Sequence, residues 1–310
     1  MSATARVLVL LAARNGGQWI GQQIDSVLAQ VGVDVRLLVR DDGSTDDTRD
    51  VVSALMAAHP RITLAEDHRA TGSASANFFA LTACADLEPF DYVAFCDQDD
   101  SWQPNKLERA VRRLREEGAA GGSAAVLARW SDGRSKVLSQ SPATRHADYL
   151  FEGAGQGCTF VFDVGVFARL RDELARQSGM LPRLHYHDWS LYALVRTFGL
   201  RWTFDPEPTM VYRQHDGNDT GARDSGAGIM RRLELIRTGW YRAQVAAVAE
   251  LVLRVNPADA AAARWIGLDA STARRRWGGR VRRLAFVARH GRRRALDRAI
   301  LVAAVALGYL

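Results

Sequence analysis

The sequence predicts an α/β protein with a doubly wound, mainly parallel sheet and a basic helical extension at its C-terminal end. Three observations predict this fold. Short apolar runs alternate with segments of helical periodicity from Val7 to Glu117. Two of the apolar runs end directly in acidic clusters. After about Gly226 the pattern is helical throughout and rich in arginine, with Pro257 as a break.

Four apolar runs predict the buried strands of the parallel part, and the segments that follow them predict its helices. The strands are expected at Val7–Ala12, Val35–Val39, Ile62–Ala65 and Tyr92–Cys96. The helices are expected at Trp19–Gln30, Asp46–Ala58, Asn77–Ala85 and from Pro104 to Glu117. Ser44, followed three residues later by Asp47, resembles a capping box for the second helix.

The middle of the chain is less regular, but it extends the same pattern. Strands are expected at Ala124–Ala128, Cys158–Phe162 and Thr209–Tyr212, a loop at Gly153–Gly157 and a helix at Asp188–Phe198. We therefore predict a catalytic domain over residues 1–222 and a helical extension over residues 223–310.

Composition indicates an ordinary globular chain. Its 310 residues are 47% hydrophobic and 25% charged. The three cysteines, Cys84, Cys96 and Cys158, are far apart and odd in number, which favours a reducing cytosol over a disulfide framework. No apolar stretch approaches the roughly 20 residues of a membrane span. We expect a cytoplasmic protein, with peripheral contact at the inner face of the cell membrane as an open alternative.

The cluster Asp97-Gln98-Asp99-Asp100 is the strongest chemical signal. Three carboxylates within four residues repel one another unless a cation or hydrogen-bond donors neutralise them. Their oxygens suit Mg²⁺ or Mn²⁺, which in such sites also bind substrate phosphates. A solvated acidic turn is the alternative, but a turn needs neither the apolar strand before the cluster nor Trp102 after it.

A second acidic pair, Asp41 and Asp42, follows the second predicted strand. Gly43 and Ser44 are explained by turn chemistry alone, whereas two adjacent aspartates at a strand end are not. Ligands of doubly wound sheets bind beyond the carboxyl ends of the strands. We therefore expect both clusters in one crevice, where a carboxylate at 41 or 42 can accept from a ribose hydroxyl or a base imide.

These motifs together resemble glycosyltransferase family 2, which has the GT-A fold. The resemblance runs in family order over roughly residues 6–220, and the branch most similar is that of bacterial rhamnosyltransferases, which build surface polysaccharides. The stretches that carry it are Val7–Gln30, Asp41–Thr48, Ala76–Phe79, Phe95–Trp102, Lys106-Leu107, His187–Trp189 and Tyr212–His215.

The resemblance implies an inverting, metal-dependent hexosyltransferase. Its donor would be a dTDP- or UDP-linked sugar, with rhamnose favoured, and its acceptor a saccharide or a lipid-linked hydroxyl. Asp188 would be the catalytic base, although an N-cap role competes for it. The metal ligands would be Asp97, Asp99 and His215. Residues expected to bind substrate are Arg14, Asn15, Asp41, Asp42, Asp97, Gln98, Lys106, Gly157, Trp189 and Arg213.

One departure from the family pattern lies after the first strand. Arg14-Asn15 stands where the family usually has an aromatic residue followed by asparagine. The donor base loses a packing partner there, while Arg14 gains access to the diphosphate.

The C-terminal segment has its own chemistry. Residues 221–310 contain 18 arginines, no lysine and 6 acidic residues, a net +12, whereas the whole chain is +6. Its uncharged end, Ala299–Leu310, is too short to span a membrane. An interfacial helix on an anionic membrane and a hairpin packed on the catalytic domain both remain open. Nucleic acid is not expected, because no stacking aromatics interleave the arginines.

Two other functions stay open at this point. A nucleotidyltransferase that makes an activated sugar would share the sheet, but it usually opens with a glycine-rich loop that Leu11–Gly17 does not match. A non-catalytic, membrane-associated partner with a degenerate site is disfavoured by the intact acidic clusters. The acceptor, the linkage and the oligomeric state have no signal in the sequence.

Overall fold

A computed structural model describes the chain except for residues 1–3, 216–229, 231–233 and 275–277, and the side chains of 269–274. The chain divides into two compact units. The first comprises Met1–Gln140, Gly155–Ser178 and Leu200–Gly221, and the second Ser141–Ala154, Gly179–Gly199 and Ala222–Leu310. Two segments that precede residue 222 therefore belong to the second unit with the C-terminal helices, and the division at residues 222 and 223 stays a prediction.

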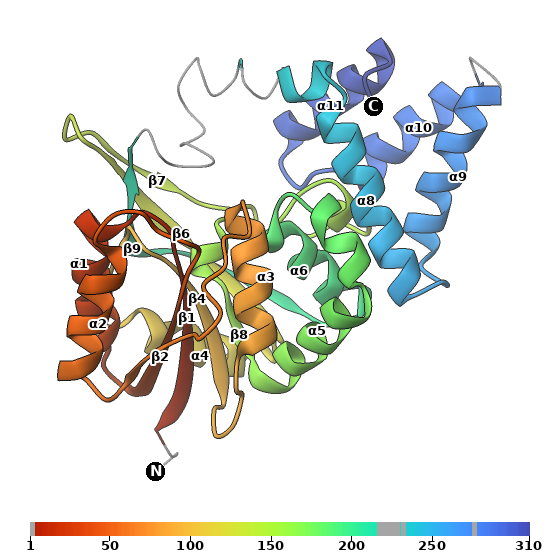
Figure 1. The fold of residues 1–310 in the computed structure, drawn as a ribbon. Coiled ribbons are helices and arrows are strands. Elements are labelled where there is room, and N and C mark those ends of the chain that lie inside the picture. The colour runs from red at the N-terminus through yellow and green to blue at the C-terminus, as the bar shows by residue number, and fades with distance from the viewer. Residues whose placement is uncertain (1–3, 216–229, 231–233, 275–277) are drawn as a thin grey trace. The chain divides into compact units, whose positions relative to one another are not determined.

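The first unit is built on a mixed sheet whose described strands number nine, in the order β3-β2-β1-β4-β8-β6-β9-β5, with β7 paired to β6 (Figure 1). The first four strands of that order are all parallel, and β6–β9 is parallel as well. The strands are β1 (Ala5–Ala13), β2 (Val33–Asp41), β3 (Ile62–Leu64), β4 (Tyr92–Asp97), β5 (Ser101–Trp102), β6 (Gly121–Trp130), β7 (Ser135–Leu138), β8 (Val161–Asp163) and β9 (Trp202–Gln214).

Helices cover both faces of this sheet, as a doubly wound fold requires. On one face, α1 (Gly17–Leu28), α2 (Thr48–Ala58) and α4 (Lys106–Glu117) share a hydrophobic core with alternate residues of β1 such as Val9 and Leu11. On the other face lie α3 (Ala74–Cys84) and α5 (Val164–Arg176), where four phenylalanine rings pack in a chain. Those rings belong to Phe78, Phe95, Phe162 and Phe167. The predicted doubly wound α/β sheet is confirmed.

Some local predictions were wrong. Ser44 does not cap α2, because its hydroxyl donates to Asp41 and the N-cap position falls on Asp47. Pro104 precedes α4 by two residues, and the helix begins at Lys106. Cys158 lies in a 3-10 turn, η2 (Gly157–Thr159), so the strand expected there begins only at Val161.

The second unit is helical and contains α6 (His187–Thr197), α8 (Trp240–Val255), α9 (Ala260–Arg274), α10 (Gly278–His290) and α11 (Ala295–Leu307). Short 3-10 turns are η1 (Asp148–Leu150), in this unit, and η3 (Ser178–Arg183). The break expected at Pro257 falls between α8 and α9. Within the described residues, no helix combines the length and apolar character that crossing a membrane takes.

Candidate active site

The carboxyl edge of the parallel strands brings the two acidic clusters near each other. Asp41 ends β2 and is in register with Ala13 of β1, while Asp97 ends β4 and is in register with Ala12. Strand β1 lies between them, so their backbones are two strand spacings apart, about 10 Å. Carboxylates therefore lie on both sides of β1 at this edge, as the prediction of a shared site requires.

Asp42 is held in place by a buried arginine. Arg40 donates to Asp42 Oδ1 at 2.9 Å and to Asn77 Oδ1 at 2.7 Å, and the Thr71 N–H donates to the same Asp42 oxygen at 2.8 Å. The second oxygen, Oδ2, is buried without a hydrogen-bond partner, and Arg14 Nη1 lies 3.6 Å from it. A buried, unsatisfied acceptor beside a half-exposed guanidinium is a ready contact for a ligand donor.

Asp41 is equally buried, but its oxygens are used locally. They accept from the backbone N–H of Ser44 at 3.1 Å and from the Ser44 hydroxyl. That hydroxyl also accepts from the Asn15 N–H at 2.8 Å, and the Asn15 side chain accepts from Thr45 N at 2.8 Å. Asn15 itself has a left-handed backbone, with φ of 49°. Asp41 and Asn15 thus join two loops at the strand ends.

Asp99 and His215 meet although 116 positions separate them in the chain. Their Oδ2 and Nε2 atoms are 2.7 Å apart. The Trp19 ring stacks on His215 with centroids 4.3 Å apart, which fixes the imidazole plane. Arg213 Nε donates to the Asp99 carbonyl at 3.0 Å, and Arg213 Nη2 donates to Gln22 at 2.8 Å. The predicted residues Asp99, Arg213 and His215 therefore form one cluster.

A second group of ligand atoms lies around the end of β4. Asp97, Asp100 and Cys158 each offer one atom, and these atoms all lie within 4.8 Å of one another. Burial, and then the charges of Asp99 and Asp97, raise the pKa of Asp100 well above its usual range. Two carboxylates in this group suit a divalent ion such as Mg²⁺ or Mn²⁺. Of the predicted metal ligands, Asp97 belongs to this group, whereas Asp99 and His215 form the pair described above.

Two further predicted residues lie beside these clusters. The Gln98 amide accepts from Arg14 N at 2.6 Å and donates to Arg14 O at 2.8 Å, which ties the end of β4 to the end of β1. Gly16 passes so close to Gln98 that a Cβ there would lie 2.3 Å from its Oε1. Gly157 opens η2 next to Cys158. The amide of Gln98 thus holds the Arg14 backbone in place.

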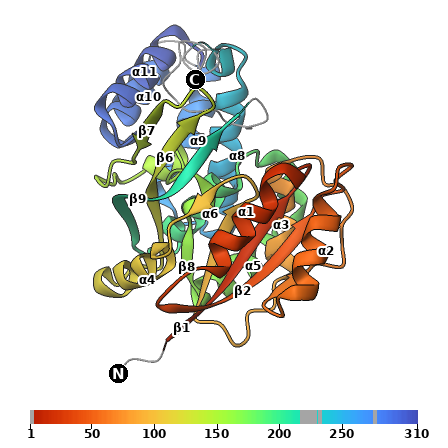
Figure 2. The ribbon, with the colours of Figure 1, turned by 90° about the vertical axis from the view of Figure 1, so that its left-hand side faces the viewer.

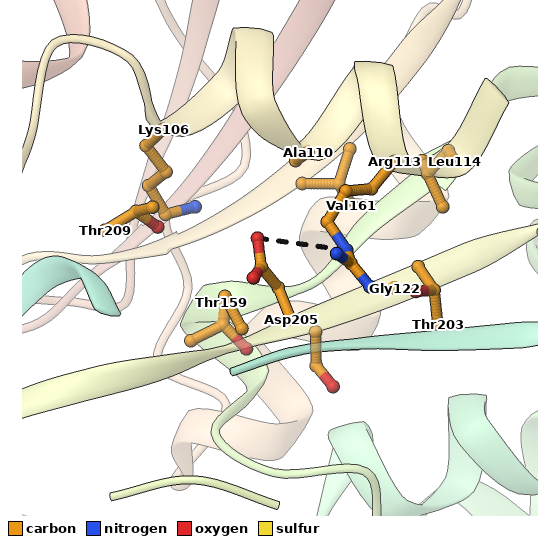
Figure 3. Close-up of a pocket in the computed structure, with 12 residues that line it drawn as sticks. Lys106, Ala110, Arg113, Leu114, Gly122, Thr159, Val161, Thr203, Asp205 and Thr209 are labelled. Carbon is orange, nitrogen blue, oxygen red and sulfur yellow. Dashed lines mark ion pairs between the residues drawn. The ribbon is translucent and has the colours of Figure 1, made fainter. Parts of the chain in front are cut away.

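Lys106 is placed differently from the other predicted substrate ligands. Its side chain is buried between α4 and the strands β6, β8 and β9, beside a small cavity of about 20 Å³ (Figure 3). The ammonium lies 3.8 Å from the Trp102 ring centroid and has no hydrogen-bond partner. Burial lowers its pKa to about 8. Asp205 lines the same cavity and pairs with Arg113 at 3.9 Å (Figure 3) and, outside the lining, with Arg109 at 2.5 Å.

A hollow of about 180 Å³ lies beside the Asp99 cluster. It is lined by side chains from α1, β5, β6 and β9: Gln22, Ser101, Arg129, Val211 and Arg213. Two arginines and an amide make this hollow suited to an anionic or hydroxyl-rich group.

Asp188 and Trp189 belong to the second unit and are described within it. Asp188 lies in the first turn of α6, whose N-cap is Tyr186, so the competing N-cap role for Asp188 is excluded. Its Oδ1 accepts from the Trp189 N–H at 2.6 Å. The Trp189 indole is buried and donates to the Tyr149 carbonyl at 2.8 Å. That Trp189 binds the acceptor stays a prediction, and in the structure the ring packs in the core of its unit.

Several residues that shape the site were missed from sequence. Trp19 and Gln22 were assigned only to a helix, yet both face the Asp99 cluster. Their spacing of three on α1 places them on one face, but nothing local in the sequence points to their partners 191 and more positions away. The roles of Arg40 and Cys158 were not predicted either, because the neighbouring sequence does not show whether such a side chain is buried against the site.

The chain is similar to known glycosyltransferases. The model of the family described as Glycosyl transferase family 2 matches residues 8–177. The dTDP-rhamnosyl transferase RfbG of Shigella flexneri is 34% identical over 240 residues, which cover 77% of this chain and 83% of that protein. An Escherichia coli protein, the UDP-Glc:alpha-D-GlcNAc-diphosphoundecaprenol beta-1,3-glucosyltransferase WfaP, is 29% identical over 36% of this chain and 42% of its own length.

Solved structures share the fold at low identity. The mannosyltransferase PcManGT from Pyrobaculum calidifontis, in complex with GDP-Man and Mn2+, matches with a TM-score of 0.52 and 17% identity, over 99% of this chain and 88% of that one. TarS 1–349 of S. aureus, in complex with UDP, matches with a TM-score of 0.51 and 12% identity, over 80% and 65%.

Proposed function

Because the chain belongs to glycosyl transferase family 2, we propose that it transfers a hexose, with inversion and with the aid of Mg²⁺ or Mn²⁺, from a nucleotide diphosphate to an acceptor hydroxyl. The favoured donor is a dTDP- or UDP-linked sugar, rhamnose first. The favoured acceptor is a saccharide or a lipid-linked saccharide in bacterial surface polysaccharide or glycolipid assembly.

One observation carries the proposal. Asp99, on the segment that leaves β4 after Asp97, pairs with His215, which follows β9. Asp97 ends β4 at the same sheet edge as the unsatisfied oxygen of Asp42. A nucleotide diphosphate needs two kinds of contact, donors and acceptors for its base and ribose and cationic or metal partners for its phosphates. At this edge, Asp42 and its neighbours offer contacts for the base and ribose. Contacts for the phosphates are offered around Asp97, Asp99, Arg213 and His215.

The donor preference rests on the named relatives. The rhamnosyl transferase that shares 34% identity supports a dTDP-linked rhamnose. The fold neighbours bind GDP-Man with Mn2+ and UDP-GlcNAc, which supports a nucleotide-diphospho-sugar in general and a divalent ion. The Arg14-Asn15 pair contributes through Arg14, which lies 3.6 Å from Asp42 Oδ2.

The reaction we propose is a single displacement at the anomeric carbon. The acceptor oxygen forms the new bond as the bond to the diphosphate oxygen breaks, and the nucleotide diphosphate leaves. The hydroxyl proton passes to a carboxylate, a role we propose for Asp188 on α6. A divalent ion, when bound by Asp97, Asp99 and His215, would stabilise the negative charge on the leaving diphosphate. Arg213 orients the Asp99 loop through its bond to the Asp99 carbonyl.

The test is a transferase assay with dTDP-rhamnose and UDP-hexoses, in the presence of Mn²⁺, with NMR of the product to assign its anomeric configuration. We expect Asp99→Asn and His215→Ala to lose at least about 100-fold in kcat/KM, the magnitude typical of a lost charge-stabilising contact. The matched control is Asp132→Asn, in the exposed turn between β6 and β7.

Two outcomes would overturn this function. One is full activity in both site variants. The other is release of pyrophosphate from a nucleoside triphosphate and a sugar phosphate, the reaction of a nucleotidyltransferase, without transfer from any nucleotide sugar.

A further inference from the structure

Helix α11 has an apolar face that no part of the described chain covers. Leu296, Ile300 and Leu307 are 75%, 42% and 72% exposed, and Ala303 between them is exposed as well. Their spacing of four, seven and eleven places them on one side of the helix. The opposite side, with Leu301, Ala304 and Val305, is buried in its own unit. Single exposed leucines are ordinary, but a continuous apolar stripe marks an interaction surface.

The surroundings of this stripe are basic. Helix α10 lies beside α11 (Figure 2), and the two are antiparallel, since the Arg280 guanidinium lies against Gly308 at the far end of α11. Exposed Arg282 and Arg289 lie on α10, and exposed Arg294 precedes α11. The valine at position 281, 59% exposed, adds apolar surface on α10. A stripe bordered by cations fits a partner that is apolar inside and anionic at its surface.

Not every arginine of the segment is available for such a partner. Residues 278–310 contain eight arginines and one acidic residue, Asp297. Arg283 is buried 4.6 Å from the Trp265 ring centroid, and Arg293 is buried against Asp148. Arg292 faces inward as well, since it donates to the Phe151 carbonyl at 3.1 Å. The five that remain leave a surplus of four positive charges over the aspartate. The basic character of the surface therefore persists after the buried pairs are removed.

We propose that the face formed by α10 and α11, with Leu296, Ile300 and Leu307 at its centre, binds the surface of an anionic lipid bilayer. At 13 residues, α11 is about 20 Å long, so it lies in the interface and does not cross. Leucine side chains enter the acyl boundary while arginines contact lipid phosphates.

Charge decides against a second copy of this chain as the occupant. An isologous dimer would bring the arginine-bordered stripe onto an identical one, so that like charges face each other across the contact. A bilayer with anionic headgroups supplies the opposite charge at the same depth as the arginines. Membrane binding itself does not depend on the proposed reaction. The purpose we give it, which is to bring the enzyme to a lipid-linked acceptor, rests on the proposed function.

The experiment is co-sedimentation of the full chain with vesicles, without donor or acceptor. One set contains phosphatidylglycerol in phosphatidylcholine and the other phosphatidylcholine alone. We expect binding to the anionic set, weakened by added salt, and a loss of about tenfold or more in Leu296→Glu/Leu307→Glu. The matched control is Val137→Glu, an exposed apolar residue on β7, which should bind as the wild type does.

A second set of variants tests whether binding depends on the positive charge of the arginines or on their specific side-chain shape. Arg282→Gln/Arg289→Gln/Arg294→Gln should lose binding to anionic vesicles, and the Lys versions of the same three should retain it. Thermal unfolding should be unchanged in all of them, because the substituted side chains are exposed. Transfer to a water-soluble acceptor should persist in the Leu296→Glu/Leu307→Glu variant, so loss of membrane binding and failure of the proposed reaction can be told apart.

Three results would overturn the proposal: no binding to anionic vesicles, equal binding by the glutamate variant, or a dimer in analytical ultracentrifugation that this variant makes monomeric. The last would assign the stripe to a second copy.

Discussion

Asp188 is the residue on which the proposed chemistry makes its sharpest prediction. It lies in the first turn of α6, and its Oδ1 accepts from its neighbour's backbone N–H. Desolvation lowers the pKa of the adjacent His187 to about 3, so that imidazole is neutral at physiological pH. With a neutral histidine beside it, the carboxylate of Asp188 is the group on this turn that we propose as the general base.

We expect Asp188→Asn to lower kcat by about 10²–10⁴-fold, because the amide cannot accept the acceptor proton. The Kd of the nucleotide sugar, measured by calorimetry with Mn²⁺, should stay within about twofold of the wild type. Asp172→Asn, an exposed position on α5, serves as the control. An Asp188→Asn enzyme with normal turnover would remove this residue from the mechanism.

Lys106 illustrates how burial sets the charge of a single side chain. Its pKa falls from the ordinary 10.5 to about 8 because the ammonium is buried, and the Trp102 face offsets only part of that cost. The unfolded chain keeps the proton between pH 8 and 10.5, whereas the folded chain releases it. Folding stability therefore bears the full cost below about pH 8 and recovers it as the pH rises toward 10.5.

We therefore expect Lys106→Met to raise the free energy of unfolding at pH 7, by up to about 3 kcal/mol, the equivalent of the pKa change. The advantage should shrink as pH rises from 8 toward 10.5. Denaturant unfolding at several pH values measures it, with the exposed Lys136→Met as the control. A variant that is destabilised equally at every pH would contradict this account of Lys106.

At the scale of elements, α6 is bound to the C-terminal helices through a buried polar network. Asp148 of η1 accepts from Tyr192 at 2.8 Å and from Arg196 at 2.9 Å, both on α6. Arg293, between α10 and α11, donates to Asp148 at 3.0 Å and to the Gly153 carbonyl at 2.7 Å. Part of the arginine-rich segment is thus core of the unit that carries Asp188.

Removal of Arg293 should accordingly destabilise the second unit. We expect Arg293→Met to cost about 3–5 kcal/mol, because Asp148 loses a buried charge partner. Arg282→Met, an exposed change in the same segment, should cost less than about 0.5 kcal/mol. Chemical denaturation measures both. Equal, small effects would show that the network contributes little to stability.

An element could be predicted from the sequence where the residues that determine it are close together in the chain. Strands β1, β2 and β4 are continuous apolar runs with turn residues after them, and they were predicted within one to two residues of their ends. Strand β5 has two residues and β7 has four, so neither shows a detectable alternation of apolar and polar residues. Helix α5 was not predicted. The Ser44 cap failed because a closer carboxylate, Asp41, takes the hydroxyl.

The site could be predicted in part for the same reason. Asp41 and Asp97 follow strands, so the rule for parallel sheets places them at one edge, and the register with β1 confirms it. The Asp99–His215 contact spans 116 positions, and only the resemblance to the family pointed to it. The burial of Lys106, the contact of Trp19 and the partners of Arg40 depend on long-range packing, which no local pattern encodes.

At the scale of the whole molecule, the thermal stability of the chain should depend jointly on the nucleotide-sugar donor and the metal ion. A ligand that binds only the folded state stabilises it by about 2.7 kcal/mol when present at 100 times its Kd. We expect a dTDP- or UDP-sugar to raise the Tm only when Mg²⁺ or Mn²⁺ is present, and EDTA to abolish the shift. In Asp99→Asn the metal-dependent part should be missing.

This prediction is checked by a thermal-shift screen of nucleotide sugars, each with Mn²⁺ and with EDTA. An equal Tm shift with and without metal would show that donor binding does not require the ion.

The burial of Lys106 also matters for anyone who wishes to attach this protein to a surface. The printed sequence has two lysines, Lys106 and Lys136, and only the second is exposed. An amine-reactive linker should therefore couple, among the lysines, at Lys136 on β7 and not at Lys106. The abundant arginines, which such reagents leave untouched, would remain cationic on a sensor chip or bead.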